Sequence, residues 1–515
     1  MKSYIRCLAL TVTALVGVSA VGQAVENKSA PASQPTTMTV TKSGTSTVTV
    51  TTTAVSPRTV GMGDLTFTVT PADEPKPALK YQFFPPRVDR MPGNAVLMID
   101  QAIQMAPSGE RGDKWKSKYS ERIGELLDVP LEQIRRSPAV QQEIQDIVGA
   151  YGSSLNYMEL AAYRRDADWG LPYEKGIAMF MPSLSPLRQE AKVLALKAGL
   201  ETAQGKYDQA IKTLETGYSV AEQTGGATLI NSLVGVAMEA LLNYQVMTMV
   251  QQPGCPNLYW ALASLPPSIG KMEQGMQLEP AYLYMQFPEL KDYKKLTPEQ
   301  WRVMVHKIED MMRQCMGQDL PKLASVAMVA SNVGPAKEYL AENGYTPEQI
   351  KKMTPSQIVG LYFMDEWNYW WDETNKWGML PFGKGQEGAA RANKAMEERM
   401  ASHPGSLVSI LMPGLSKART LQARVDRGVA SLMAVEAIRM YAARHEGKPP
   451  ATLADLNTLA PAPDDPMTGK PFEYKADGQT FVLRGVLIPG GQAGRDEFKY
   501  TVTIVPQAKG ASNAK

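Results

Sequence analysis

Apolar residues recur at helical spacing through most of the chain after residue 79. The clearest case is a pair of stripes on either side of Gln204-Gly205, where the pattern breaks. Residues three and four apart share one face of a helix, so each stripe predicts a helix with one buried face. The first stripe is Leu187, Ala191, Leu194 and Ala198, and the second is Tyr207, Ala210, Ile211, Leu214, Tyr218 and Ala221.

A third helix is expected from Leu229 to Val250, and its apolar content on all sides predicts that it is the buried helix. The two preceding stripes resemble one tetratricopeptide repeat. Gly205, Tyr207, Ala210 and Leu214 occupy the small, aromatic, small and large packing positions of that motif. The resemblance implies a helical hairpin of the kind that stacks into concave binding surfaces, and a hairpin that serves only the core is the alternative.

Three helix starts after residue 290 share one chemistry. The tetrapeptide Thr-Pro-Glu-Gln occurs at 297–300 and at 346–349, and Thr-Pro-Ser-Gln follows at 354–357. Thr accepts a hydrogen bond from a free backbone N–H, Pro suits the first helical position, and Gln reaches back to the cap. These caps predict helices over about 298–318 and 355–377.

The last hundred residues change from helix to strand. A long helix is expected from about 416 to 444, and Gly447 with Pro449-Pro450 ends it. Two strands around Asp477-Gly478 form a predicted hairpin, and alternating apolar residues from Phe498 to Ile504 predict a third strand. The predicted fold class is therefore mainly α, with packed helical hairpins and a small C-terminal α+β module of antiparallel strands.

The N-terminus is typical of an export signal. A basic start, a short apolar run and small residues up to Ala24 predict a cleaved signal peptide at 1–24. The run is shorter than the roughly 20 apolar residues that a membrane anchor needs. Residues 25–76 are rich in Thr, Ser and Pro, which predicts a flexible stalk containing a strand pair, one strand being 65–69.

Five segments follow from these boundaries. After the signal peptide and stalk come a helical domain over 77–290, a helical extension over 291–405, and a long helix with a small sheet over 406–510. We expect a periplasmic or extracellular location and no transmembrane span in the mature chain. The formal net charge is +2 with acids and bases interspersed, so nothing favours nucleic-acid binding.

The densest aromatic cluster is Leu361 to Trp377. Trp367 and Trp370 lie on one predicted helix side, next to Asp365 and Glu366. Aromatic faces beside carboxylates can stack on sugars and transfer protons, so these four residues are the candidate ligand site. An aromatic core stripe with an acidic solvated edge is the alternative.

Other side chains suggest metal or redox chemistry. Asp464 and Asp465 share a tight turn and are the candidate Ca²⁺ ligands, with turn formation as the alternative. Cys255 and Cys315 are the candidate disulfide, with two free thiols as the alternative. A set of soft ligands that suits Cu(I), with a packed apolar stripe as the alternative, is Met304, His306, Met311, Met312, Cys315 and Met316.

Common catalytic signatures are absent from the sequence. There is no H-E-x-x-H, G-x-S-x-G, Walker A or paired C-x-x-C motif, and the three histidines lie far apart. This argues against the common hydrolases, P-loop enzymes and zinc modules. An enzyme that uses only Asp and Glu stays open, because carboxylate pairs have no fixed spacing. No cofactor is expected.

Particular segments of the sequence resemble two groups of known proteins. Residues 443–456 (A-R-H-E-G-K-P-P-A-T-L-A-D-L), followed by D-D-P-M-T-G-K-P-F-E-Y, look like the globular part of type II secretion pseudopilins. That resemblance implies a helix leading through a Gly/Pro segment to a small sheet. Residues 79–95, 251–262 and 424–474 resemble large exported planctomycete proteins without an assigned function. This second resemblance implies export and brings no catalytic residues.

Three functional hypotheses follow. The first is an envelope interaction or scaffold protein that binds a protein partner on a helical concave surface. The second is a carbohydrate-binding or hydrolytic enzyme centred on Trp367, Trp370, Asp365 and Glu366. The third is an envelope assembly factor related to pseudopilins.

Overall fold

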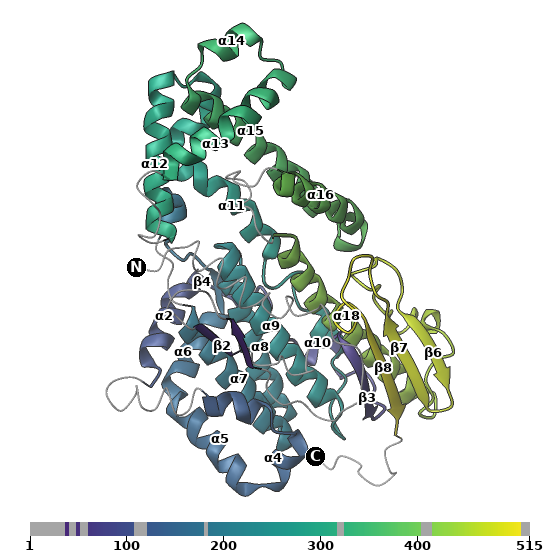
Figure 1. Cartoon of the computed structure of the whole chain (residues 1–515). Coiled ribbons are helices and arrows are strands. Elements are labelled where there is room, and N and C mark those ends of the chain that lie inside the picture. Colours follow the sequence, from purple (N-terminus) through teal and green to yellow (C-terminus); the bar gives the residue numbers. More distant parts are fainter. Residues whose placement is uncertain are drawn as a thin grey trace.

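The computed structural model describes residues 37–40, 48–51, 60–107, 121–179, 184–316, 324–402 and 415–505. Within these residues the protein is mainly α-helical, with a small sheet near the C-terminus, which confirms the predicted fold class (Figure 1). The predicted signal peptide at 1–24 lies outside the described residues.

Three consecutive helices form the centre of the helical domain. They are α7 (Ser185–Ala203), α8 (Tyr207–Thr224) and α9 (Leu229–Val250), close to the predicted limits. Gly205 joins α7 to α8 with a φ of +71°, which suits glycine because it has no Cβ. Gly217 lets α8 approach α9, since a Cβ there would lie 2.7 Å from Leu242.

Helix α9 is the buried helix that the sequence predicts. It is the one helix among the described residues that is long and apolar enough to cross a membrane. Of its apolar window, 72% is buried inside the protein, which is typical of the core helix of a packed domain.

Shorter elements surround this centre. Ile144 and Ile147 on one of them form a second core with Val193 and Leu196 of α7. The elements are η1 (Ala78–Lys80), β4 (Met91–Asn94), α2 (Ala95–Met105), α4 (Leu131–Arg136), α5 (Pro138–Ala150), α6 (Gly152–Ala162), β5 (Arg164–Asp166), η2 (Tyr173–Ala178) and α10 (Tyr259–Ala263). Strands β4 and β5 pair in parallel. Farther toward the N-terminus, β1 (Thr37–Val40) pairs antiparallel with β2 (Val48–Thr51).

The helical extension projects away from the domain, α15 runs from its far end toward the sheet, and α16 begins next to the sheet module at Phe382 (Figure 1). Helix α11 (Met272–Gln286) and η3 (Pro288–Lys295) lead into the extension, and its further elements are α12 (Pro298–Met316), α13 (Ala324–Glu342), α14 (Pro347–Lys352), α15 (Pro355–Asn375), η4 (Lys376–Met379) and α16 (Phe382–Ser402). The three predicted caps are confirmed, because Thr297, Thr346 and Thr354 each accept a hydrogen bond from the backbone N–H of the Gln three residues later.

The C-terminal module consists of the long helix α18 (Leu415–Arg444), η5 (Leu453–Leu456) and a four-stranded sheet. The strands are β3 (Gly63–Val69), β6 (Glu473–Asp477), β7 (Thr480–Gly485) and β8 (Phe498–Ile504), in the order β3-β8-β7-β6. The hairpin β6–β7 and the antiparallel pair β7–β8 agree with the sequence prediction.

Strand β3 corrects two expectations. The sequence predicts a strand at 65–69 within a stalk that extends to residue 76. The structure instead pairs β3 in parallel with β8, which makes the sheet mixed. Phe67 and Val69 of β3 are buried in the main core. Residues 60–76 therefore belong to the C-terminal module, because a strand with one apolar face is stabilised by burying it there.

Helix α18 carries two arginines that are completely buried and paired. Arg427 donates from Nε and Nη2 to both oxygens of Asp465, at 2.8 and 2.7 Å, and from Nη1 to the Asp496 carbonyl at 2.7 Å. Arg439 donates to Glu436 at 2.6 Å and to the carbonyl oxygens of Thr70 and Cys255. A buried guanidinium is stable only when its N–H donors have hydrogen-bond partners. These pairs therefore fix α18 against the segment after β3, at Thr70, and against the C-terminal residues Asp465 and Asp496.

The segment 251–262, which carries one of the sequence resemblances, packs on α18 through the same network. The backbone N–H of Leu258 donates to Glu436 Oε2 at 2.7 Å. Asn257 donates to the carbonyl oxygens of Glu436 and Ala72, at 2.8 and 3.2 Å. The side chain of Asn257 therefore links the helical domain, α18 and the segment that follows β3.

Replacement of Arg427 by Leu is expected to lower the free energy of unfolding by about 3–5 kcal/mol, because it leaves the Asp465 carboxylate buried without its partner. The matched control is Arg484→Ala, which removes an exposed pair with Glu473 and should cost at most about 1 kcal/mol. Denaturant unfolding followed by circular dichroism measures both values. Equal effects of the two substitutions would contradict the role assigned to Arg427.

Candidate functional site

The aromatic cluster predicted as a ligand site lies on α15 and is part of the core. Trp367 is 4% exposed and Trp370 is 9% exposed. The Trp367 ring stacks on Trp371 with the ring centroids 5.6 Å apart, and it also contacts the Phe363 ring. The two tryptophans therefore pack the helical extension and present no open ring face on which a sugar could stack.

The neighbouring carboxylates connect α15 to other elements. Asp365 accepts a hydrogen bond from the Tyr293 hydroxyl and forms an ion pair with Lys294 at 3.5 Å. Glu366 is buried and accepts a hydrogen bond from Arg399 Nε of α16 at 2.8 Å. The structure thus supports the interpretation of this stretch as a core stripe whose acidic residues bind neighbouring elements.

The thiol and thioether candidates are also in the interior where they are described. Cys255 is a buried free thiol that donates to the Pro256 carbonyl at 3.3 Å, and burial raises the pKa of this thiol to about 12. Met304 and Met311 are buried in the main core. The side chains of Met312, Cys315 and Met316 lie outside the described residues, so the disulfide and the copper site stay predictions.

Asp464 and Asp465 differ in their surroundings. Asp464 is exposed, whereas both oxygens of Asp465 accept hydrogen bonds from Arg427, and Oδ1 also accepts from the N–H of Met467 at 2.9 Å. Asp465 is therefore already engaged in the turn, which supports its structural interpretation. No group of three or more His, Cys, Asp or Glu side chains within the described ranges is arranged to hold a metal ion.

A cavity among the described residues lies where α16 meets α18 and the loop between β7 and β8. Two pockets of about 340 and 420 Å³ adjoin here, and both are lined by Phe382 and Arg419. We call them together the composite cleft. Its walls come from α11, the α15–α16 connection, α18 and residues 464–496, which are distant in sequence. Asp464 and Asp465 line the larger pocket, so part of the predicted metal site faces this cleft.

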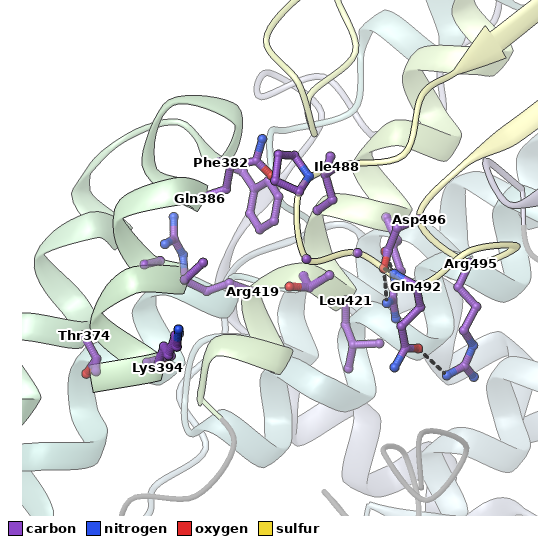
Figure 2. A pocket seen from close by; sticks show the side chains of 18 of the residues that line it. Thr374, Phe382, Gln386, Lys394, Arg419, Leu421, Ile488, Gln492, Arg495 and Asp496 are labelled. Carbon is purple, nitrogen blue, oxygen red and sulfur yellow. Dashed lines mark hydrogen bonds and ion pairs between the residues drawn. The ribbon is translucent and has the colours of Figure 1, made fainter. Parts of the chain in front are cut away.

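The first pocket has a distinct arrangement of side chains. In Figure 2, Thr374 and Lys394 lie on one side, Gln492, Arg495 and Asp496 lie on the other, and Phe382 and Arg419 lie between them. We call this pocket the basic end of the composite cleft, because its cationic side chains outnumber its acidic ones. The cations are Lys394, Arg419, Arg424 and Arg495, and the acids are Glu397 and Asp496.

The β7–β8 loop at the basic end is held by α18. Arg424 donates from Nε and Nη2 to the two oxygens of Asp496, at 2.6 and 3.1 Å. Asp496 also accepts from the N–H of Gln492 at 2.7 Å, and Arg427 binds the Val486 carbonyl at 3.0 Å. The wall of the pocket is therefore preformed, because both ends of the loop are anchored to one helix.

One carboxyl group of the second pocket, that of Asp426, is paired with a buried carboxyl group outside the pocket, that of Glu239. Gln422 donates from one nitrogen to Glu239 at 3.3 Å and to Asp426 at 2.8 Å. Burial raises the pKa of Asp426 to about 6, and burial together with the nearby charge of Asp426 raises the pKa of Glu239 well above its ordinary value. Asp426 lines the pocket, whereas Glu239 lies behind it on α9. This pocket, with Glu273, Asp426 and Asp464, is the acidic end of the composite cleft.

Sequence reasoning did not identify the cleft. Its charged residues belong to four segments that no motif connects, and Arg419 and Arg424 look like ordinary solvated positions of a long helix. The Gly490-Gly491 pair in the β7–β8 loop is a local sequence feature of the cleft, but such a pair indicates a turn and no ligand.

Comparison with known proteins gave no match: no family model, no curated protein and no solved structure is significantly similar to this chain.

Replacement of Gly360 by Ala is expected to destabilise the helical extension by about 1–3 kcal/mol, because the added Cβ would lie 2.3 Å from the buried Trp301 ring. The control is Gly149→Ala in α5, where no atom lies within 4 Å and the substitution should stabilise the helix by about 0.5–1 kcal/mol. Thermal unfolding of both variants tests this packing. A neutral Gly360→Ala variant would contradict it.

Replacement of Asp426 by Asn should change how stability depends on pH. Because the folded state raises the pKa of Asp426 from 3.8 to about 6, this carboxyl stabilises the fold fully below pH 3.8. The contribution is lost as the pH rises from 3.8 to 6. The difference in unfolding free energy between wild type and Asp426→Asn should therefore fall over this range. A constant difference from pH 3.5 to 7 would show that the carboxyl keeps its ordinary pKa.

Proposed function

We propose that this chain is an exported helical interaction or scaffold protein of the cell envelope, and that it binds its protein partner at the composite cleft. The observation that carries the proposal is the cleft itself: two adjoining pockets, preformed by α18 and assembled from four distant parts of the chain. Concave sites at the junction of separate structural units are where ligands and partners most often bind.

The rim of the cleft supports binding of a macromolecule. Met379 is 80% exposed, and Leu380 is also exposed beside it in the second pocket. Leu487, next to Ile488 of the first pocket, is exposed as well. Exposed apolar side chains grouped around a cavity are typical of interaction sites, whereas apolar side chains scattered singly over a surface are common and indicate no site.

The proposed location rests on residues 1–24, whose basic start, apolar run and small residues are typical of a secretory signal. Cell fractionation followed by N-terminal sequencing of the purified chain tests this part. We expect a mature N-terminus near residue 21 or 25 in the envelope or periplasmic fraction. An intact Met1 on cytosolic protein would contradict export.

The enzymatic alternative loses the observation on which it rested, because Trp367 and Trp370 are buried and Glu366 is paired with Arg399. The pseudopilin-like hypothesis rests on two short sequence segments. The resemblance concerns the C-terminal residues alone, whereas the sheet also contains the N-terminal strand β3, which pairs in parallel with β8. The binding hypothesis is the one that a described cavity supports.

A photo-cross-linking side chain placed at Met379 tests the proposed binding site in cells. The matched control position is Val88, which is 86% exposed and does not line the cleft. We expect a discrete adduct from position 379 in envelope fractions and none from position 88. Excess purified wild-type chain should suppress the adduct by competing for the partner.

Two results would contradict the proposal: absence of an adduct at position 379, or equal labelling from positions 379 and 88. An adduct that persists in the presence of excess wild-type chain would count as non-specific labelling and would also contradict it.

A further inference from the structure

The basic end of the composite cleft contains a cation whose charge is only partly compensated. Arg419 is half-buried, and its guanidinium lies 5.8 Å from the centre of the Phe382 ring. Its Nη2 donates to the Leu380 carbonyl at 3.3 Å. A guanidinium has five N–H donors, and among the described residues this carbonyl is the one hydrogen-bond acceptor that contacts Arg419.

The electrostatics of the pocket agree with this geometry. Burial lowers the pKa of Arg419, and the charge of Glu273 offsets only part of that effect. Burial and the nearby Arg424 also lower the pKa of Arg495, which lines the same pocket. Both arginines are thus less favourably charged than in water, and an anion bound to Arg419 would reverse that effect at Arg419.

The acidic groups of the pocket supply little compensation. Asp496 is already bound by Arg424 and by the N–H of Gln492. Glu397 is exposed to solvent, where its charge is screened. Glu273 and Asp464 line the second pocket, so the side of Arg419 that faces the first pocket is the more favourable one for an anion.

Apolar side chains complete the pocket. Phe382, Leu421 and Ile488 face the cavity near Arg419 in Figure 2, and Met276 of α11 also lines it. A cavity of about 340 Å³ accommodates a charged group with a short apolar stem.

We infer that the basic end of the composite cleft binds a carboxylate or phosphate attached to an apolar stem, with Arg419 as the residue that holds the acidic group. The stem lies against Phe382, Leu421 and Ile488. This inference rests on the proposed function, because it names the chemistry by which the cleft recognises its partner.

Isothermal titration calorimetry of the full chain with sodium octanoate, octyl phosphate and 1-octanol tests the inference. These probes share a stem and differ only in the head group. Both anions should bind with one site per chain, and octanol should bind at least about tenfold more weakly. The tighter of the two anions identifies the acidic group. The affinity for the anions should fall between 50 and 500 mM salt.

Arg419→Gln should weaken binding of the anions by about tenfold or more, while binding of octanol stays unchanged. The matched control is Arg391→Gln, an exposed cation on α16 that does not line either pocket, which should change affinity less than twofold. Arg419→Lys keeps the charge but loses the two-pronged geometry, and an intermediate affinity is expected. It replaces Arg419→Gln if that variant does not fold.

Equal affinity for octanol and octanoate, no binding of either anion at 10 mM, or full affinity in the Arg419 variants would overturn the inference. The two proposals fail separately. Loss of cross-linking at Met379 refutes the binding site as a whole, whereas cross-linking without anion binding refutes only the acidic ligand.

Discussion

The buried arginines of α18 are the interactions on which the structure depends. Arg439 connects the helical domain to the segment after β3, and Arg427 connects α18 to the turn at Asp465 and to the β7–β8 loop. Arg427 binds the Asp465 carboxylate and Arg439 binds that of Glu436 on the same helix, and both donate to carbonyl oxygens from distant parts of the chain. The same helix therefore contacts the sheet module and shapes the wall of the cleft, because Arg424 and Arg427 hold the loop that lines it.

Local chemistry made much of the fold predictable. The helices around Gly205 and the caps at Thr297, Thr346 and Thr354 depend on neighbouring residues, and the structure confirms them. The pairing of β3 with β8 was not predictable, because a parallel partner more than 400 residues away leaves no local signal. The alternating residues of β3 correctly indicated a strand, but its Thr-rich surroundings suggested a stalk.

For the candidate site, the strength of the sequence signal did not match the role of the residues in the structure. The aromatic stripe of α15 gave the strongest sequence signal, yet large aromatic residues on one helix face most often serve the core, as Trp367 does. The cleft gave almost no signal, since Arg419 and Phe382 acquire their significance only when α16 and α18 come together. Asp464 and Asp465 were predicted as chemically important and do line the cleft, although Asp465 serves Arg427.

The central claim is that α18 holds the β7–β8 loop in place before any ligand binds. Hydrogen exchange of the free protein measures this most directly, because the N–H groups of Gln492, Arg495 and Asp496 all donate hydrogen bonds within the loop. We predict that exchange at these amides is slowed by roughly a hundredfold or more relative to an unstructured peptide. Exchange at the unstructured rate, with the rest of the sheet protected, would contradict the claim.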